Sequence, residues 1–194
     1  MIIVLAQKKD ALTIAKIHKA EIGAGFLSSL SIAFLTRFYQ ALIESKSSFC
    51  VVAKEQNELV GFIAGVSNMD TFYAYFLGHY FFQSFFILLP SIFSSFKKIW
   101  EALRYPTKEQ SLPKAELLTI AITKEFQGKG VGSLLLPKFV AEMKKRNVGI
   151  FKVVVGQQLA NAIKFYEKNN FIFLQNTTIH GKDVSKVYTY HINT

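Results

Sequence analysis

The sequence predicts an α/β fold in which helices flank a mixed central β-sheet, within a single domain that covers residues 1–194. Apolar runs typical of strands alternate along the chain with segments whose apolar residues recur at helical spacing. In the second half, an apolar strand leads through a glycine-rich loop directly into an apolar helix. A chain of 194 residues has room for a sizeable core, which favours one domain.

The N-terminal part predicts one strand and two helices. Residues 1–7, MIIVLAQ, are expected to form a short buried strand. Apolar residues at helical spacing predict helices over 11–21, with Asp10 as the N-cap, and over 30–45. Residues 23–29, GAGFLSS, contain turn-forming residues and are expected to form the loop between these helices.

Two β-type runs within 49–67 predict the second and third strands. Gln56 and Asn57 stand between these runs, and a short polar pair in this position is a signal for a hairpin. We therefore expect the two strands to be joined by a tight turn.

The segment 71–96 is rich in Phe and Tyr and contains no Asp, Glu, Lys or Arg. A transmembrane helix needs roughly 20 mostly apolar residues, but polar residues such as His79 and a proline, Pro90, interrupt this run. A membrane span would also place the two halves of the sheet on opposite sides of a bilayer. We therefore expect an aromatic-rich helical insertion over about 70–113, between the third and fourth strands. Peripheral contact of 71–100 with a membrane surface is the alternative.

The remaining chain predicts strands that alternate with helices and then a closing hairpin. Strands are expected over 116–123 and 150–156, helices over 131–146 and 160–169, and the hairpin over 171–192. The hairpin is expected to turn at His180-Gly181-Lys182-Asp183. This order of elements is typical of a mixed sheet.

Charge and composition exclude several classes of function. The net charge is +10, but the 23 Lys and Arg residues are scattered along the chain. The longest basic run, 144–146, ends a predicted helix, where cations suit the helix dipole. We therefore expect no nucleic-acid partner, whereas a polyanionic small ligand fits the charge equally well. The four histidines have no metal-ligand spacing, so no metal is expected.

The expected location is the cytoplasm. The single cysteine, Cys50, cannot form an internal disulfide, which suits a reducing compartment. The apolar run at the start of the chain is too short for a signal peptide, and no basic segment precedes it.

The segment 125–135, EFQGKGVGSLL, places three glycines between a strand and a helix. A Walker A loop would need Lys and then Ser or Thr after its last glycine, but Ser133 follows Gly132 directly. A dinucleotide fingerprint would need glycine where Ser133 stands. The pattern that does fit is Q-x-x-G-x-G, formed by Gln127, Gly130 and Gly132.

The motif 127–132, QGKGVG, resembles the pyrophosphate loop of the GNAT superfamily of acetyl-CoA-dependent N-acetyltransferases. The order of elements also resembles that family over most of the chain outside 70–113. The segment 161–171, NAIKFYEKNNF, is similar to the family's second cofactor motif, a helix that carries a tyrosine. The resemblance implies transfer of an acetyl group from acetyl-CoA to a primary amine, without a metal.

The resemblance also implies where acetyl-CoA binds. Backbone N–H groups of the loop would bind the pyrophosphate, aided by the helix dipole. In the family, the strand before the loop diverges from its neighbour, and its free amides pair with the pantetheine arm. Asn161 lies close to position 159, where the family often has asparagine but this chain has Leu159. The implied cofactor-binding residues are Ile120, Ala121, Ile122, Gln127, Gly128, Lys129, Gly130, Val131, Gly132, Ser133 and Asn161.

Glu116 is the candidate general base, because transfer to an amine requires removal of a proton. Its spacing from Gln127 equals that of the catalytic glutamate in the histone-acetyltransferase-like branch of the family. Strand alternation predicts that Glu116 shares a face with Ile120 and Ile122. Desolvation beside such a face would raise the pKa of the carboxyl. The alternative is a surface glutamate at the start of a strand.

Tyr166 is the family's general acid by position, so the resemblance implies that it protonates the departing thiolate. The alternative is a half-buried aromatic residue with a hydrated hydroxyl. Asn170 replaces the glycine that is common at the end of this helix, and asparagine tolerates the left-handed conformation needed there.

The insertion and the segment 21–29 are expected to border the acceptor site. An aromatic wall suits the apolar face of a sugar ring. The candidates for its polar contacts are Tyr73, Tyr75, His79, Tyr80 and Gln83. The arrangement resembles GNAT proteins of bacterial surface-glycan synthesis, so an amino sugar is the expected acceptor. The alternatives are a small-molecule or peptide amine, or an inactive module that binds coenzyme A. The sequence leaves open whether the chain forms a homodimer.

Overall fold

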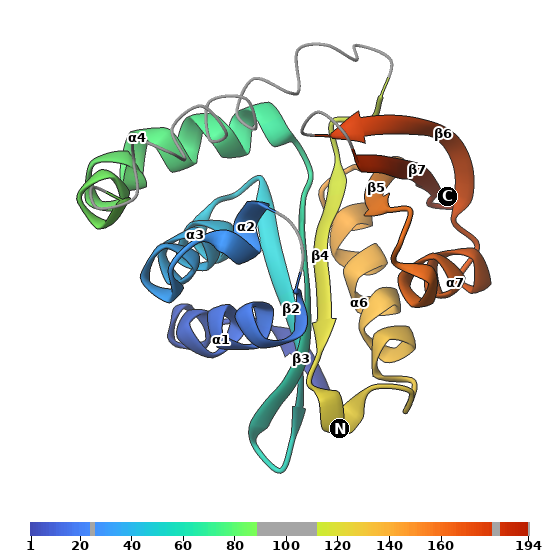
Figure 1. Cartoon of the computed structure of the whole chain (residues 1–194), viewed down its shortest axis with the longest axis horizontal. Coiled ribbons are helices and arrows are strands. Elements are labelled where there is room, and N and C mark those ends of the chain that lie inside the picture. Colours follow the sequence, from blue (N-terminus) through green and yellow to red (C-terminus); the bar gives the residue numbers. More distant parts are fainter. Residues whose placement is uncertain (24–25, 89–111, 180–182, 194) are drawn as a thin grey trace.

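The computed structural model describes residues 1–23, 26–88, 112–179 and 183–193, and Figure 1 shows their arrangement. One sheet of seven strands has the order β1-β2-β3-β4-β5-β7-β6. The pair β4–β5 is parallel and the other neighbours are antiparallel, so the sheet is mixed as predicted. The strands are β1 (Ile2–Leu5), β2 (Ser48–Glu55), β3 (Glu58–Val66), β4 (Glu116–Ile122), β5 (Ile150–Gly156), β6 (Ile172–Ile179) and β7 (Asp183–His191).

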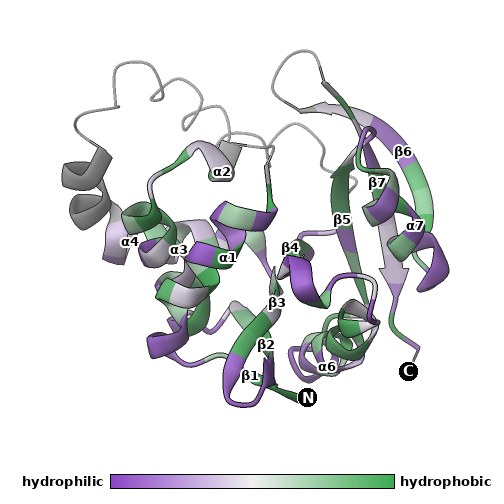
Figure 2. Ribbon diagram, turned by 60° about the horizontal axis from the view of Figure 1, so that its bottom comes forward, coloured by the Kyte–Doolittle hydropathy of each residue, from purple (hydrophilic) through white to green (hydrophobic). Residues whose placement is uncertain are grey.

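Helices cover both faces of this sheet, with α1, α3 and α4 on one side and α6 and α7 on the other (Figure 1). Each layer encloses its own apolar core, and green ribbon in Figure 2 marks the apolar segments. The helices are α1 (Ala11–Glu21), α2 (Phe26–Ser29), α3 (Ile32–Glu44), α4 (Met69–Leu88), α6 (Val131–Lys145) and α7 (Ala160–Lys168), with 3-10 turns η1 (Lys8–Asp10) and η4 (Lys124–Phe126).

The α3 helix forms because its sequence combines an N-cap with an apolar stripe. The Ser31 hydroxyl accepts a hydrogen bond from the backbone N–H of Phe34 at 3.2 Å. The predicted stripe is buried, since Leu35 and Leu42 are fully enclosed and Phe38 is only 8% exposed. The helix therefore packs with its predicted face on the sheet.

Two local expectations for the N-terminal part are wrong. The β1 strand is present but exposed, with Ile2 62% accessible, because it lies at the edge of the sheet and pairs only with β2. The predicted loop over 23–29 contains the short helix α2. Asp10 stands at the predicted N-cap position of α1, but its side chain makes no capping hydrogen bond there. Its carboxylate instead accepts from the backbone N–H of Gln7 at 2.8 Å and pairs with Lys54 at 3.0 Å.

The hairpin between β2 and β3 turns at Gln56 and Asn57, as predicted. Both residues have positive φ, 49° and 71°, which is typical of the turns that match strand twist. The second predicted hairpin is present as the antiparallel pair β6–β7, whereas residues 180–182 of its turn lie outside the described residues.

The α4 helix begins the predicted insertion and packs on α3. Phe72 and Phe76 are buried, and each contacts Phe38, with ring centroids 5.8 Å apart in both pairs. The Tyr80 hydroxyl donates a hydrogen bond to the Glu44 carboxylate. The remainder of the insertion, 89–111, lies outside the described residues. None of the helices that the structure describes has the length and apolar character needed to cross a bilayer.

Candidate active site

Strands β4 and β5 are paired at only one position among the described residues and then diverge, and this divergence is the main feature of the candidate site (Figure 1). Their register contains one pair, Glu116 opposite Lys152. On its other edge, β4 stays paired with β3 as far as Ile122. Among the described strands, the edge of β4 that faces β5 therefore has no hydrogen-bonded partner beyond this pair. We call the point at Glu116 and Lys152 where the two strands separate the β4–β5 fork. The divergence implied by the family resemblance is present.

A β-bulge at Leu118 interrupts the alternation of β4, because the register with β3 skips this residue. Leu117 and Ile120 consequently pack in the core on the α6 side, while Leu118 packs against the core under α1 and α3. Glu116 alternates with Leu117 and so shares a face with Leu118. The expectation that Glu116 lies on the face of Ile120 and Ile122 is wrong, since the bulge reverses the alternation between them.

The Glu116 carboxylate lies in an ion pair that the sequence analysis did not anticipate. Its Oε2 is 2.9 Å from the Lys152 ammonium, and the two side chains are only 17% and 13% exposed. The same ammonium donates to the Pro113 carbonyl at 2.6 Å. Burial raises the pKa of Glu116, and the positive charge of Lys152 opposes this shift. The raised pKa of Glu116 agrees with the prediction, although the carboxylate lies on the other face of β4 and is paired with Lys152.

Tyr73 of α4 interacts electrostatically with this carboxylate. Burial raises the pKa of the Tyr73 phenol, and the negative charge of Glu116 adds to the shift. The other candidate acceptor contacts on α4 have different partners. Tyr80 is bound to Glu44 on α3, and Tyr75 stacks on His79 with centroids 4.3 Å apart. The side chain of Gln83 lies outside the described residues.

Tyr166 lies on α7 and is 4% exposed, so it is more deeply buried than a half-buried aromatic residue. Its ring contacts Phe165, Phe171 and Tyr188 at centroid distances between 5.1 and 6.4 Å. Burial raises the pKa of its phenol. Within the described part of the chain, no contact joins Tyr166 to Glu116, which lies on β4 beside Lys152.

The glycines of the loop are required for two different reasons, a left-handed backbone conformation and a close contact between helices. Gly128 and Gly130 have φ of 74° and 81°, a conformation that side-chain-bearing residues rarely adopt. Gly132 has no such φ, but a Cβ there would lie 3.0 Å from a ring carbon of Phe165. The third glycine therefore permits close packing of α6 against α7, a reason that the sequence pattern did not reveal.

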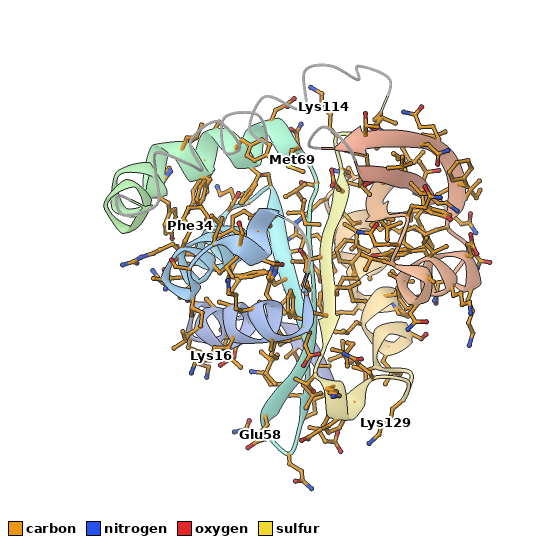
Figure 3. All side chains as sticks on the ribbon, viewed as in Figure 1. Lys16, Phe34, Glu58, Met69, Lys114 and Lys129 are labelled. Carbon is orange, nitrogen blue, oxygen red and sulfur yellow. The ribbon has the colours of Figure 1, made fainter. Side chains whose placement is uncertain are left out.

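The first turn of α6 fits an anionic group. Its N-cap residue, Gly130, has no side chain to form a capping hydrogen bond, and the first turn contains no acidic residue. The first helical bond runs from the Leu134 N–H to the Gly130 carbonyl, so the N–H groups of residues 131–133 have no partner within the helix. Lys129, labelled in Figure 3, adds a positive charge and lies over the Phe126 ring at 5.2 Å.

The Gln127 side chain stabilises the loop through hydrogen bonds to two other segments. Its side-chain amide donates to the Ile122 carbonyl and to the Glu21 carboxylate, both at 2.9 Å. Glu21 also accepts from the backbone N–H of Lys124 at 3.1 Å. Glu21 ends α1, and sequence reasoning missed its role because this contact joins segments about a hundred residues apart.

Two further positions in α7 can be placed. Asn161 is exposed in the first turn of this helix, and Leu159 precedes the helix without a capping side chain. Asn170, just beyond the helix, has a φ of 64°. The prediction that asparagine serves here in the left-handed conformation is confirmed.

A chain of buried polar side chains leads from α2 to the bulge of β4. The His18 ring lies 3.3 Å from the Ser28 hydroxyl and 2.6 Å from the Tyr39 hydroxyl, which is in turn hydrogen-bonded to Thr119. Burial lowers the pKa of His18 to about 4. Among the described residues, no three His, Cys, Asp or Glu side chains form a group that could hold a metal ion.

Several solved structures are similar to this one. An N-acetyltransferase from Staphylococcus aureus Mu50 is 16% identical, with 99% of this chain and 98% of that chain covered and a TM-score of 0.66. A protein from Salmonella typhimurium, described as an acetyltransferase and solved with its cofactor acetyl-CoA, is 15% identical at 100% and 95% coverage and a TM-score of 0.63. The ribosomal-protein-S18-alanine N-acetyltransferase from Escherichia coli is 14% identical at 100% and 94% coverage and a TM-score of 0.61. These identities show a common fold.

The sequence itself matches the model of the acetyltransferase (GNAT) family over residues 16–171. No curated protein sequence matches at a significant level. The family match extends from within α1 to just beyond α7, so it includes both the β4–β5 fork and the loop before α6. The chain therefore belongs to the GNAT family of acetyltransferases and is an acetyl-CoA-dependent N-acetyltransferase.

Proposed function

We propose that acetyl-CoA lies along the free edge of β4 and against the first turn of α6, and that Glu116 and Tyr166 are the general base and general acid. The observation that carries this proposal is the end of the ladder at the β4–β5 fork. Among the described strands, backbone groups of residues 120–122 have no partner on that side and can pair with the amides of the pantetheine arm.

The loop over 127–133 supports the same placement of the cofactor. The free N–H groups and the positive end of the α6 dipole favour a pyrophosphate at this position. Gln127 holds the loop against Glu21 and Ile122, so the N–H groups are oriented before the cofactor binds. Asn161, exposed at the start of α7, is the remaining proposed contact.

The reaction joins the acceptor nitrogen to the acetyl carbon and breaks the carbon–sulfur bond. The nitrogen loses a proton, which Glu116 takes up directly or through a water, and the sulfur gains one, which Tyr166 supplies. The raised pKa of Glu116 suits a base near neutral pH. The raised pKa of Tyr166 keeps its phenol protonated until the thiolate departs.

We propose an amino sugar of a surface-glycan precursor as the acceptor. Tyr73, an aromatic residue with a hydroxyl, interacts electrostatically with Glu116, and aromatic rings pack well on the apolar face of a sugar. The net charge of +10 suits an acceptor that carries a nucleotide diphosphate. A cytoplasmic location, with peripheral membrane contact through 71–100, would fit this role.

A second class of acceptor competes with the amino sugar. A peptide amine is favoured by the similarity to the Escherichia coli enzyme, whose name gives the alanine of ribosomal protein S18 as its substrate.

The test is thiol release from acetyl-CoA with four acceptors: a UDP-linked amino sugar, the free amino sugar, a peptide with an N-terminal alanine, and spermidine. We expect the UDP-linked amino sugar to react fastest, and Glu116→Gln to abolish the acid limb of its kcat/KM profile. Glu125→Gln, which changes an exposed glutamate, is the matched control. Transfer to the peptide alone would overturn the amino-sugar assignment.

A further inference from the structure

Lys152 is a buried lysine that the proposed chemistry does not use. It is the third residue of β5, IFKVVVG, whose other side chains are apolar or absent. The Lys152 side chain is only 13% exposed. Burial of an ammonium group is unfavourable unless the group is paired, so the partners of Lys152 indicate its role.

Both partners of the ammonium lie at the β4–β5 fork. Its Nζ is 2.9 Å from Glu116 Oε2 and 2.6 Å from the Pro113 carbonyl oxygen. Glu116 and Lys152 also form the only backbone pair between the two described strands. The ion pair is therefore located where the strands separate and where the acceptor would meet the thioester in the proposed function.

Few other charged groups face the Glu116 carboxylate from the elements around it. On β3 its register partner is the apolar Val66, and α4 contributes the Tyr73 phenol. Lys114, close by in the chain, pairs with Asp70 at 2.7 Å on the surface. In the part of the chain that the structure describes, Lys152 is the cation in contact with Glu116.

We propose that Lys152 is a positioning residue for the general base: its ammonium group holds the Glu116 carboxylate at the β4–β5 fork and keeps it ionised. The inference rests on the proposed role of Glu116. An opposite charge at this distance typically lowers the pKa of a carboxyl by about one to three units, which offsets the effect of burial. A buried ion pair is rarely better for stability than apolar residues of similar size, so strand pairing alone does not require this lysine.

The test measures the ionisation of Glu116 directly and needs no acceptor. Protein labelled with carbon-13 at the glutamate carboxyl is titrated by NMR, and Glu116→Gln identifies the signal. We expect Lys152→Met, which removes the charge, to raise the titration midpoint of the Glu116 carboxyl by about one to three pH units. Lys152→Arg, which keeps the charge, should leave this midpoint near the wild-type value. Lys114→Met is the matched control, because it removes a nearby lysine whose partner is Asp70.

The kinetic counterpart is the pH profile of thiol release with the four acceptors named above. Lys152→Met should move the acid limb of kcat/KM to higher pH by the same shift and regain wild-type activity at alkaline pH. If Lys152→Met does not fold, Lys152→Gln, which can still donate to the Pro113 carbonyl, is titrated in its place. An unmoved NMR midpoint overturns the role of Lys152. A moved midpoint with full activity in Glu116→Gln overturns the role of Glu116 instead, so the two failures are distinct.

Discussion

Tyr166 is enclosed by the rings of Phe165, Phe171 and Tyr188, and burial keeps its phenol protonated across the neutral range. A group in this state can donate a proton but cannot accept one. The proposed role as general acid is therefore compatible with its surroundings, whereas a role as base is not. Its contacts are made by the ring, so the hydroxyl can be removed without disturbing them.

We expect Tyr166→Phe to lower kcat by about 10²- to 10⁴-fold, the usual contribution of a general acid, with little change in KM for acetyl-CoA. The ring contacts remain, so the variant should fold. Tyr188→Phe is the control, because it removes the same atom from a neighbouring ring whose hydroxyl is bonded to Glu167. Steady-state thiol release measures both variants. Equal kcat values for both variants and the wild type would contradict the assignment.

The lowered pKa of the buried His18 ring leads to a prediction of how the stability of the protein depends on pH. Its pKa is lowered to about 4 in the fold, from an ordinary value of 6.5. The unfolded chain therefore binds the proton at higher pH than the folded chain, and stability is lost as pH falls through this window. The difference corresponds to about 3 kcal/mol in the free energy of unfolding.

Urea unfolding of the wild type and of His18→Gln, from pH 7 to pH 4, tests this expectation. The gap in the free energy of unfolding between the two proteins should narrow by up to about 3 kcal/mol toward acid pH. A gap that stays constant would show that His18 is not buried as a neutral ring.

At the scale of elements, the start of α6 combines an uncapped N-terminus with a glycine loop of unusual conformation. A substitution at Gly132 would confound two effects, because a side chain there meets Phe165. Ser133 avoids this problem, since it is exposed in the first turn. An acidic side chain at this position also interacts favourably with the helix dipole.

We expect Ser133→Glu to weaken acetyl-CoA binding at least about tenfold, which corresponds to about 1.4 kcal/mol. The cause is repulsion between the new carboxylate and the pyrophosphate. The free energy of unfolding should stay the same or rise by about 0.3–1 kcal/mol. Calorimetry with acetyl-CoA measures the affinity, and Ser133→Gln, similar in size but neutral, should bind like the wild type. Undiminished affinity in Ser133→Glu would place the pyrophosphate elsewhere.

For the molecule as a whole, α4 decides whether the insertion belongs to the same cooperative unit as the sheet. Its buried side, with Phe72 and Phe76, contacts Phe38 of α3, while His79 faces solvent. Replacement of the whole helix would therefore remove core side chains, and single substitutions are a cleaner test. They also test the prediction of one domain over 1–194.

We expect Phe76→Ala to lower the free energy of unfolding by about 3–5 kcal/mol, as for other buried phenylalanines. His79→Ala, one turn away on the exposed side, should change it by less than about 0.5 kcal/mol. Urea unfolding followed by both fluorescence and circular dichroism should show one coincident transition. Two separate transitions, or similar small effects of both substitutions, would contradict a single unit.

The sequence by itself determined the features that depend on local conformation and periodicity. The turn at Gln56 and Asn57 is one, and the left-handed Asn170 is another. The glycine loop before α6 and the apolar stripe of α3 also formed as predicted. Each of these is set by a few adjacent residues, because allowed φ and ψ angles and helical spacing are properties of the local chain.

Only the tertiary structure decided which distant groups meet. It placed β1 at an edge, where its apolar side chains stay exposed, and it moved Glu116 to the other face of β4 through the bulge at Leu118. It also paired Glu116 with Lys152. Strand order, bulges and ion pairs depend on contacts between residues far apart in the chain, so local propensity could not have predicted them.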